Sequence, residues 1–152
     1  MILLAKPDPH RVVQLCTVVV QTLPNKLFEL RELYRFDVSF NRLTLIDNFA
    51  DLTALRYLDA SHNEFEVVPL DLATSLTLLE HLDLSHNRIS ELPTYFGELR
   101  RLRRLNLAHN DIAEFPNDRM DVLASVKVRR GDFASAYAHR AMHVLPSARY
   151  RF

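Results

Sequence analysis

The sequence predicts an α/β solenoid, in which short parallel strands stack side by side and irregular segments return the chain between them. The first observation is a frame of apolar residues whose Asn recurs after 22, 24 and 23 residues. The second is an apolar residue five places after each of these Asn residues, usually followed by Pro, as in Leu92-Pro93. A fixed period of this length is the signature of stacked repeats. The third is an apolar content of 48% over 152 residues, enough for one continuous core.

The frame reads L-x-x-L-x-L-x-x-N-x-L and predicts where each strand lies. Its four clear copies, within residues 25–122, begin at Leu33, Leu55, Leu79 and Leu102. Strand side chains alternate between two faces, so the two central apolar residues of a copy, such as Leu82 and Leu84, point into the core. The strand face that is not buried in the core forms the concave wall.

The recurring Asn is expected to have a structural role. The turn after each strand buries backbone groups, and a side-chain amide can both donate to and accept from such groups. We therefore expect a ladder formed by Asn41, Asn63, Asn87 and Asn110. Pro disfavours a regular helix in the returning segments, so short helical or 3₁₀ turns are expected there.

Altered turns are expected at both ends of a single domain spanning 1–152, which gives about six turns in all. Residues 1–24 are interpreted as a degenerate N-terminal turn and cap, with Val13 and Leu15 in its strand and Val18 at the Asn position. The open end of this turn is covered either by Ile2-Leu3-Leu4 or by a partner protein.

Residues 123–152 are interpreted as a terminal strand, a capping helix and a basic tail. Gly131 takes the Asn position, and Asp132 can cap a helix that ends at Pro146.

The stretch LDLSHNRISELPTYFGELRRLRRLNLAHNDIAEFP, residues 82–116, resembles the leucine-rich-repeat family. The likeness extends over roughly residues 10–133 and is greatest to the intracellular 23-residue class similar to Ras-suppressor-like proteins. Departures are Val18 and Gly131 at Asn positions, Asp47 at a Pro position and Ala60 at a core Leu position. The resemblance implies a leucine-rich-repeat solenoid that binds protein partners through its concave face.

Charge and cysteine content restrict the function further. Nineteen basic and nineteen acidic residues cancel, which gives no reason to expect general binding to nucleic acid or membranes. Cys16 is the only cysteine, which favours a reducing, intracellular location, and within the cell the cytoplasm. The opening MILL run is too short for a signal peptide or membrane span, while a short organelle-targeting segment stays open.

Asp83, Ser85 and His86 have the residue types of a hydrolase triad. The same residues recur as Asp59-Ser61-His62, which indicates that they belong to the repeat consensus. No G-x-S-x-G motif accompanies them. We expect no catalysis, no cofactor and no small-molecule substrate.

A column of histidines is the other candidate for chemistry. His62, His86 and His109 occupy equivalent positions and should lie about 5 Å apart. Three imidazoles in line make poor tetrahedral geometry, so a partly exposed structural column is expected rather than a metal site.

The concave wall is the expected binding site. Tyr and Arg are enriched in interface hot spots because both combine apolar area with directional polar groups. The residues that we expect to contact a protein partner are Tyr34, Arg35, Arg56, Tyr57, Glu80, His81, Arg103 and Arg104. The alternative is an ordinary solvated face.

A basic patch is expected towards the C-terminal end, where residues 97–152 carry 11 basic against 6 acidic residues. Its members beyond the concave wall are Arg100, Arg101, Arg129 and Arg130. It could contact phosphate or an acidic protein, and charge complementarity favours the protein. The sequence thus predicts a non-catalytic scaffold or adaptor. The alternatives are a structural subunit of a ribonucleoprotein or cytoskeletal assembly, with RNA contact, and then an enzyme or its regulatory subunit.

Overall fold

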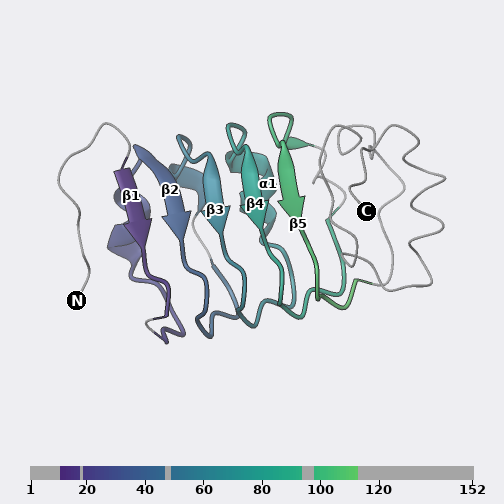
Figure 1. Ribbon diagram of the computed structural model, residues 1–152. Coiled ribbons are helices and arrows are strands. Elements are labelled where there is room, and N and C mark those ends of the chain that lie inside the picture. The colour runs from purple at the N-terminus through teal and green to yellow at the C-terminus, as the bar shows by residue number, and fades with distance from the viewer. Residues whose placement is uncertain (1–10, 18, 47–48, 94–97, 113–152) are drawn as a thin grey trace.

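The computed structural model describes residues 11–17, 19–46, 49–93 and 98–112. Five short strands form one parallel sheet in the order of the sequence (Figure 1). They are β1 (Arg11–Gln14), β2 (Leu33–Asp37), β3 (Tyr57–Asp59), β4 (His81–Asp83) and β5 (Arg104–Asn106). Each strand comes from a successive turn of the chain, so the predicted parallel-strand solenoid is confirmed.

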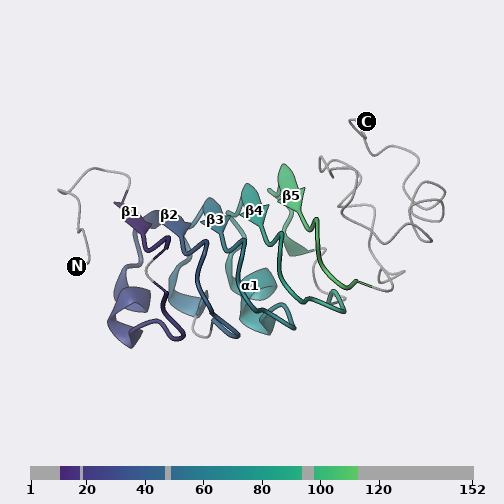
Figure 2. The same cartoon turned by 60° about the horizontal axis from the view of Figure 1, so that its bottom comes forward.

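The returning segments contain short helices, as the sequence predicts. The 3₁₀ helices η1 (Asn25–Glu29) and η2 (Phe49–Asp51) and the α-helix α1 (Leu70–Ser75) lie on the side of the core opposite the strands (Figure 2). Pro24 and Pro69 directly precede η1 and α1 in extended backbone conformations. A Pro placed just before the first turn costs the helix no hydrogen bond, because that N–H would have no partner within the helix.

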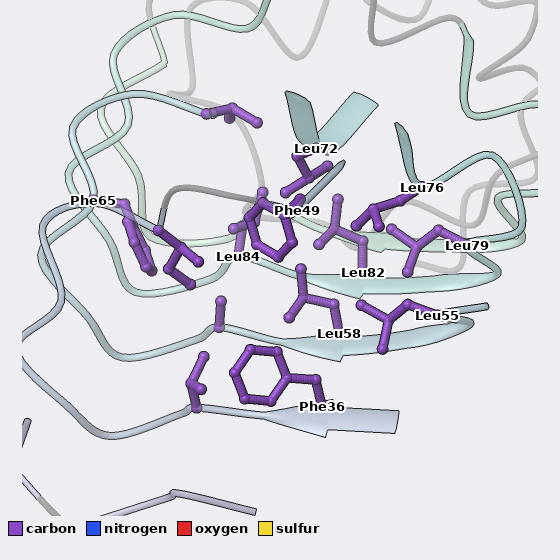
Figure 3. Packing of buried hydrophobic residues seen from close by; sticks show 14 of the residues in the cluster. Phe36, Phe49, Leu55, Leu58, Phe65, Leu72, Leu76, Leu79, Leu82 and Leu84 are labelled. Atoms are coloured by element: carbon purple, nitrogen blue, oxygen red, sulfur yellow. The ribbon is translucent and has the colours of Figure 1, made fainter. Parts of the chain in front are cut away.

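The hydrophobic core fills the space between the sheet and the helices (Figure 3). Leu82 and Leu84 are 2% and 3% exposed, which follows from the alternation of strand side chains. Phe36, Phe49 and Phe65 are among the largest fully buried side chains. Core side chains recur in every described turn, and no turn could bury them without its neighbours.

The four ladder residues share one pattern of hydrogen bonds. Asn87 Nδ2 donates to the carbonyl oxygens of Ala60, Leu84 and Ser85 at 3.0, 3.0 and 3.2 Å, while its Oδ1 accepts from the Phe65 N–H at 3.1 Å. The amide therefore joins its own turn to the preceding one.

Equivalent bonds recur at the other three ladder positions. Asn41 and Asn63 also donate to three carbonyl oxygens and accept one backbone N–H. Asn110, which is less buried, donates to the carbonyl oxygens of Leu84 and Leu107 and accepts from the Ile89 N–H at 3.0 Å.

The degenerate first turn adds its strand to the sheet despite lacking the Asn. Val13 pairs with Phe36 across β1 and β2, and Val13 and Leu15 are buried. The register shifts between Arg11 and Val12, so that Arg11 lies opposite Leu33 and not in line with Tyr34. The other predictions for the ends, which concern residues 2–4, Val18 and 123–152, lie outside the described residues, as does Asp47.

Candidate protein-binding face

The strands place the predicted concave-wall residues in two columns, which together we call the sheet face. The register aligns Arg35, Tyr57, His81 and Arg104 on β2 to β5. The second column lies one residue earlier in each turn. In each of its last three members the backbone N–H donates to the carbonyl oxygen of the equivalent residue in the preceding turn, at 2.8–2.9 Å. Its members are Tyr34, Arg56, Glu80 and Arg103. The structure therefore brings all eight predicted residues to one surface.

Aromatic rings form the centre of the sheet face. Tyr57 and His81 stack with centroids 4.3 Å apart and an interplanar angle of 8°, and Tyr34 lies 5.5 Å from Tyr57 at a tilt of 46°. The guanidinium carbons of Arg35 and Arg56 lie 5.7 and 5.8 Å from the ring centroids of Tyr57 and Tyr34, within cation–π range. These contacts hold the rings and two of the arginines in a defined arrangement.

Glu80 neutralises part of the positive charge on this surface. Its carboxylate pairs with Arg56 and lies 3.9 Å from Nη1 of Arg103. The hydrogen bond from Arg56 lowers the pKa of Glu80, and the charges of both arginines act in the same direction. The side chain of Glu80 is only 15% exposed, whereas that of Arg103 is 76% exposed. The sequence identified Glu80 as a surface residue but not as this bridge.

Arg35 and Arg104 retain uncompensated charge. Both are exposed, and neither forms an ion pair within the described part of the chain. Burial lowers the pKa of His81, and the neighbouring Arg104 lowers it further. The lowered pKa favours the uncharged His81 imidazole at neutral pH, so the ring pair lies between two cations without adding a third.

A third column, two residues further along the strands, is acidic. It consists of Asp37, Asp59, Asp83 and Asn106. Burial raises the pKa of Asp59, the two bonds from Ser61 oppose this, and the charges of Asp83 and Asp37 raise it further. Asn106 Nδ2 donates to Asp83 Oδ2 at 2.8 Å, so the amide relieves the crowding of carboxylates at that end.

The residues that resemble a hydrolase triad, Asp83, Ser85 and His86, stabilise the turn after β4. Asp83 Oδ1 accepts hydrogen bonds from the backbone N–H and the hydroxyl of Ser85 at 2.9 and 2.6 Å. Asp59 and Ser61 repeat both bonds. The serine hydroxyl thus donates to the carboxylate, and the imidazole of His86 faces other rings. In a Ser-His-Asp triad the imidazole lies between the hydroxyl and the carboxylate, whereas here the Ser85 hydroxyl bonds the Asp83 carboxylate directly.

The histidine column is a continuous stack that begins with Phe40. Centroid separations are 4.1 Å for Phe40–His62, 4.0 Å for His62–His86 and 4.1 Å for His86–His109. All four residues have positive φ, between 53° and 58°. Phe40 was missed, although its position directly before Asn41 was a sufficient signal.

One member of the stack, His86, has a lowered pKa. The pKa of His86 is lowered by burial and then by the flanking His62 and His109, against a weaker opposite effect of Asp83. Among the described residues no cluster of three or more His, Cys, Asp or Glu side chains is suited to holding a metal ion.

The predicted basic patch is only partly described. Arg100 lies 3.6 Å from the carboxylate of Glu98, and Arg101 is exposed. Arg129 and Arg130 lie outside the described residues. Within the described residues no helix is both long and apolar enough to cross a membrane.

A family model described as leucine rich repeat matches residues 61–112. This segment contains β4, β5 and the ladder residues Asn63, Asn87 and Asn110. The described residues therefore form a leucine-rich-repeat solenoid. A curated relative, Toll-like receptor 10 of Bos taurus, is 42% identical over 65 residues, which are 42% of this leucine-rich-repeat chain and 8% of the receptor. The chain thus spans a small fraction of that relative.

Two solved structures share the fold. A leucine-rich-repeat protein of Leptospira interrogans has a TM-score of 0.65 and 23% identity, over 87% of this chain and 40% of its own. The functional domain of InlJ from Listeria monocytogenes, which includes a cysteine ladder, has a TM-score of 0.58 and 21% identity, over 71% and 22%. At these identities the likeness concerns the fold. The narrower Ras-suppressor-like class stays a prediction.

Proposed function

We propose that this leucine-rich-repeat chain is a non-catalytic scaffold or adaptor that binds a protein partner through the sheet face. The observation that carries the proposal is the fixed arrangement of Tyr34, Tyr57 and His81 with arginines packed on the rings. Aromatic residues and Arg supply most of the binding energy in typical protein interfaces. Side chains already held by their neighbours lose less entropy when a partner binds.

The ion pairs of the described residues favour a protein partner over RNA. Glu80 offsets Arg56 and Arg103, and Glu98 offsets Arg100. The Asp column beside the sheet face would repel a phosphate backbone. A mixed surface of this kind suits a protein that carries both charges. We infer an intracellular location from the single Cys16, which is free and partly exposed.

The proposal is tested by affinity purification with the full chain, followed by quantitative mass spectrometry. The double variant Tyr57→Ala/Arg104→Ala should lose a partner that the wild type retains, while its thermal unfolding stays close to that of the wild type. The matched control, Lys26→Ala/Thr77→Ala, changes exposed residues on the opposite side, in η1 and just after α1. Equal recovery of every partner by both variants would exclude the sheet face as the binding site.

A further inference from the structure

Two arginines of the sheet face have no ion-pair partner among the described residues, and they bracket its ring pair. Arg35 lies on β2 and Arg104 on β5, with Tyr57 and His81 on the strands between them in the same column. Arg35 also packs over the Tyr57 ring, 5.7 Å from its centroid. From one end to the other, the column therefore presents a cation, two stacked rings and a second cation.

The distance between the two arginines of this column determines which peptide conformation can contact both. Three strand separations of about 4.8 Å place Arg35 and Arg104 about 14 Å apart. In an extended peptide, residues i and i+4 lie about 13–14 Å apart and point to the same side, with i+2 between them. On an α-helix a rise of about 14 Å takes about nine residues, which leaves the two side chains on opposite faces.

We propose that the sheet face binds an extended protein segment with the pattern acidic-x-aromatic-x-acidic, lying across the strands. This rests on the proposed function and specifies its partner. The two carboxylates contact Arg35 and Arg104, where charge-assisted hydrogen bonds are stronger than neutral ones. The aromatic side chain between them packs on the edge of the Tyr57–His81 stack.

The acidic column restricts where negative charge is accepted. Asp37, Asp59 and Asp83 lie two residues, about 7 Å, further along each strand. A segment carrying additional carboxylates on that side would be repelled, whereas Lys or Arg there would be attracted. Glu80 likewise disfavours a carboxylate at the middle of the segment. The pattern is therefore two acidic positions and not a general acidic run.

The experiment selects binders from a random 16-residue peptide library displayed on phage, using the full chain as bait. We expect the pattern acidic-x-aromatic-x-acidic to be enriched. A synthetic peptide of that pattern should bind at least about tenfold more weakly to Arg35→Glu or Arg104→Glu than to the wild type, as measured by fluorescence polarisation. The matched control Lys26→Glu makes the same charge change in η1 and should retain the affinity.

Charge reversal separates a direct contact from general disruption. A second peptide carries Lys in place of the acidic residue opposite the altered arginine. This peptide should bind Arg35→Glu or Arg104→Glu and should bind the wild type only weakly. The unfolding midpoints of both variants are measured alongside, so that a folding defect is recognised.

Three results would overturn the inference. Binders that lack paired acidic residues, but are lost with Tyr57→Ala, would disprove the acidic pattern while leaving the sheet face as the binding site. Binders unaffected by Tyr57→Ala, Arg35→Glu and Arg104→Glu would also count against the proposed function. Failure to select any binder would disprove the short extended segment, since a segment of that length should suffice.

Discussion

The Asn ladder and the sheet face are both columns that cross the same turns, but they differ in how strictly each turn repeats. At the ladder the same residue makes the same kind of hydrogen bonds to the preceding turn wherever it occurs. On the sheet face one column changes from Arg35 to Tyr57, His81 and Arg104 without altering the strand register. Stacking therefore fixes the buried column and leaves the exposed one free to specify a partner.

Two other columns lie between these extremes. The ring stack keeps a positive φ and a separation near 4 Å while Phe40 replaces His at one end. In the acidic column each side chain accepts a hydrogen bond from the backbone N–H two residues later. Asn106, which replaces Asp, keeps this bond, because its Oδ1 accepts the Ala108 N–H at 3.3 Å. Each column keeps the contact that the fold needs and varies the rest, and this difference can be tested by mutation.

The largest loss of stability is expected at the ladder. Asn87→Ala removes an amide that donates to three carbonyl oxygens and accepts one N–H, all in a buried turn. Leaving these groups unsatisfied should lower the free energy of unfolding by about 1–3 kcal/mol. Urea denaturation followed by circular dichroism measures it.

Two variants calibrate that loss. Asn110→Ala should cost less, because its amide is less buried and donates to two carbonyl oxygens. Arg88→Ala, in the same turn as Asn87, breaks only an exposed ion pair with Glu64 and should cost less than about 1 kcal/mol. If Asn87→Ala were no more costly than Arg88→Ala, the ladder would not hold the turns together.

A smaller effect of opposite sign is expected in the acidic column. The raised pKa of Asp59 means that its ionisation is less favourable in the folded state, so its contribution to stability declines as pH rises through the range above 3.8. Asp59→Asn keeps an oxygen for the Ser61 cap and removes a like charge beside Asp37 and Asp83. We expect a gain of about 0.2–1 kcal/mol at neutral pH. The gain should vanish in acid, and a variant that is less stable at neutral pH would contradict this interpretation.

The ring stack should make stability depend on pH near neutrality. The lowered pKa of His86 means that the folded state binds its proton less readily than the unfolded state. Folding stability should therefore decrease as pH falls through about 6.5. His86→Phe repeats the ring found naturally at Phe40, so it keeps the stack and should flatten this dependence between about pH 7.5 and 5.5 in thermal unfolding scans. An unchanged slope would place the titrating group elsewhere, with His81 the next candidate.

The sequence was sufficient to predict most of the fold because the fold is periodic. The spacing of Asn41, Asn63, Asn87 and Asn110 placed the strands and identified the columns of the sheet face. Even the strand of the degenerate first turn was located, because Val13 and Leu15 were predicted to lie in it.

Contacts between columns were not predictable in the same way. The bridge from Glu80 to Arg56 and Arg103 depends on where long side chains bend, which the repeat frame does not specify. The register shift at Arg11 arises where the frame is weakest, at the first strand. Periodicity specifies backbone position, whereas the choice of ion-pair partner is decided among several side chains within reach.

The smallest effect on stability, and a gain in binding, are expected for Glu80→Gln. The lowered pKa of Glu80 means that its contribution to stability is present above pH 4.5 and is lost as pH falls through the lowered value. The change should alter the free energy of unfolding much less than Asn87→Ala does. Arg103 is exposed, so solvent screens its attraction to Glu80.

Binding should respond in the opposite direction to stability. Gln frees the charges of Arg56 and Arg103, which raises the positive potential of the sheet face and should strengthen binding of the acidic-x-aromatic-x-acidic peptide, most clearly at low salt. Fluorescence polarisation at two salt concentrations measures this, with Glu64→Gln as the control because Glu64 pairs with Arg88 away from the face. Weaker binding to Glu80→Gln, with unchanged stability, would mean that Glu80 positions Arg56 for the partner and does not compete with it.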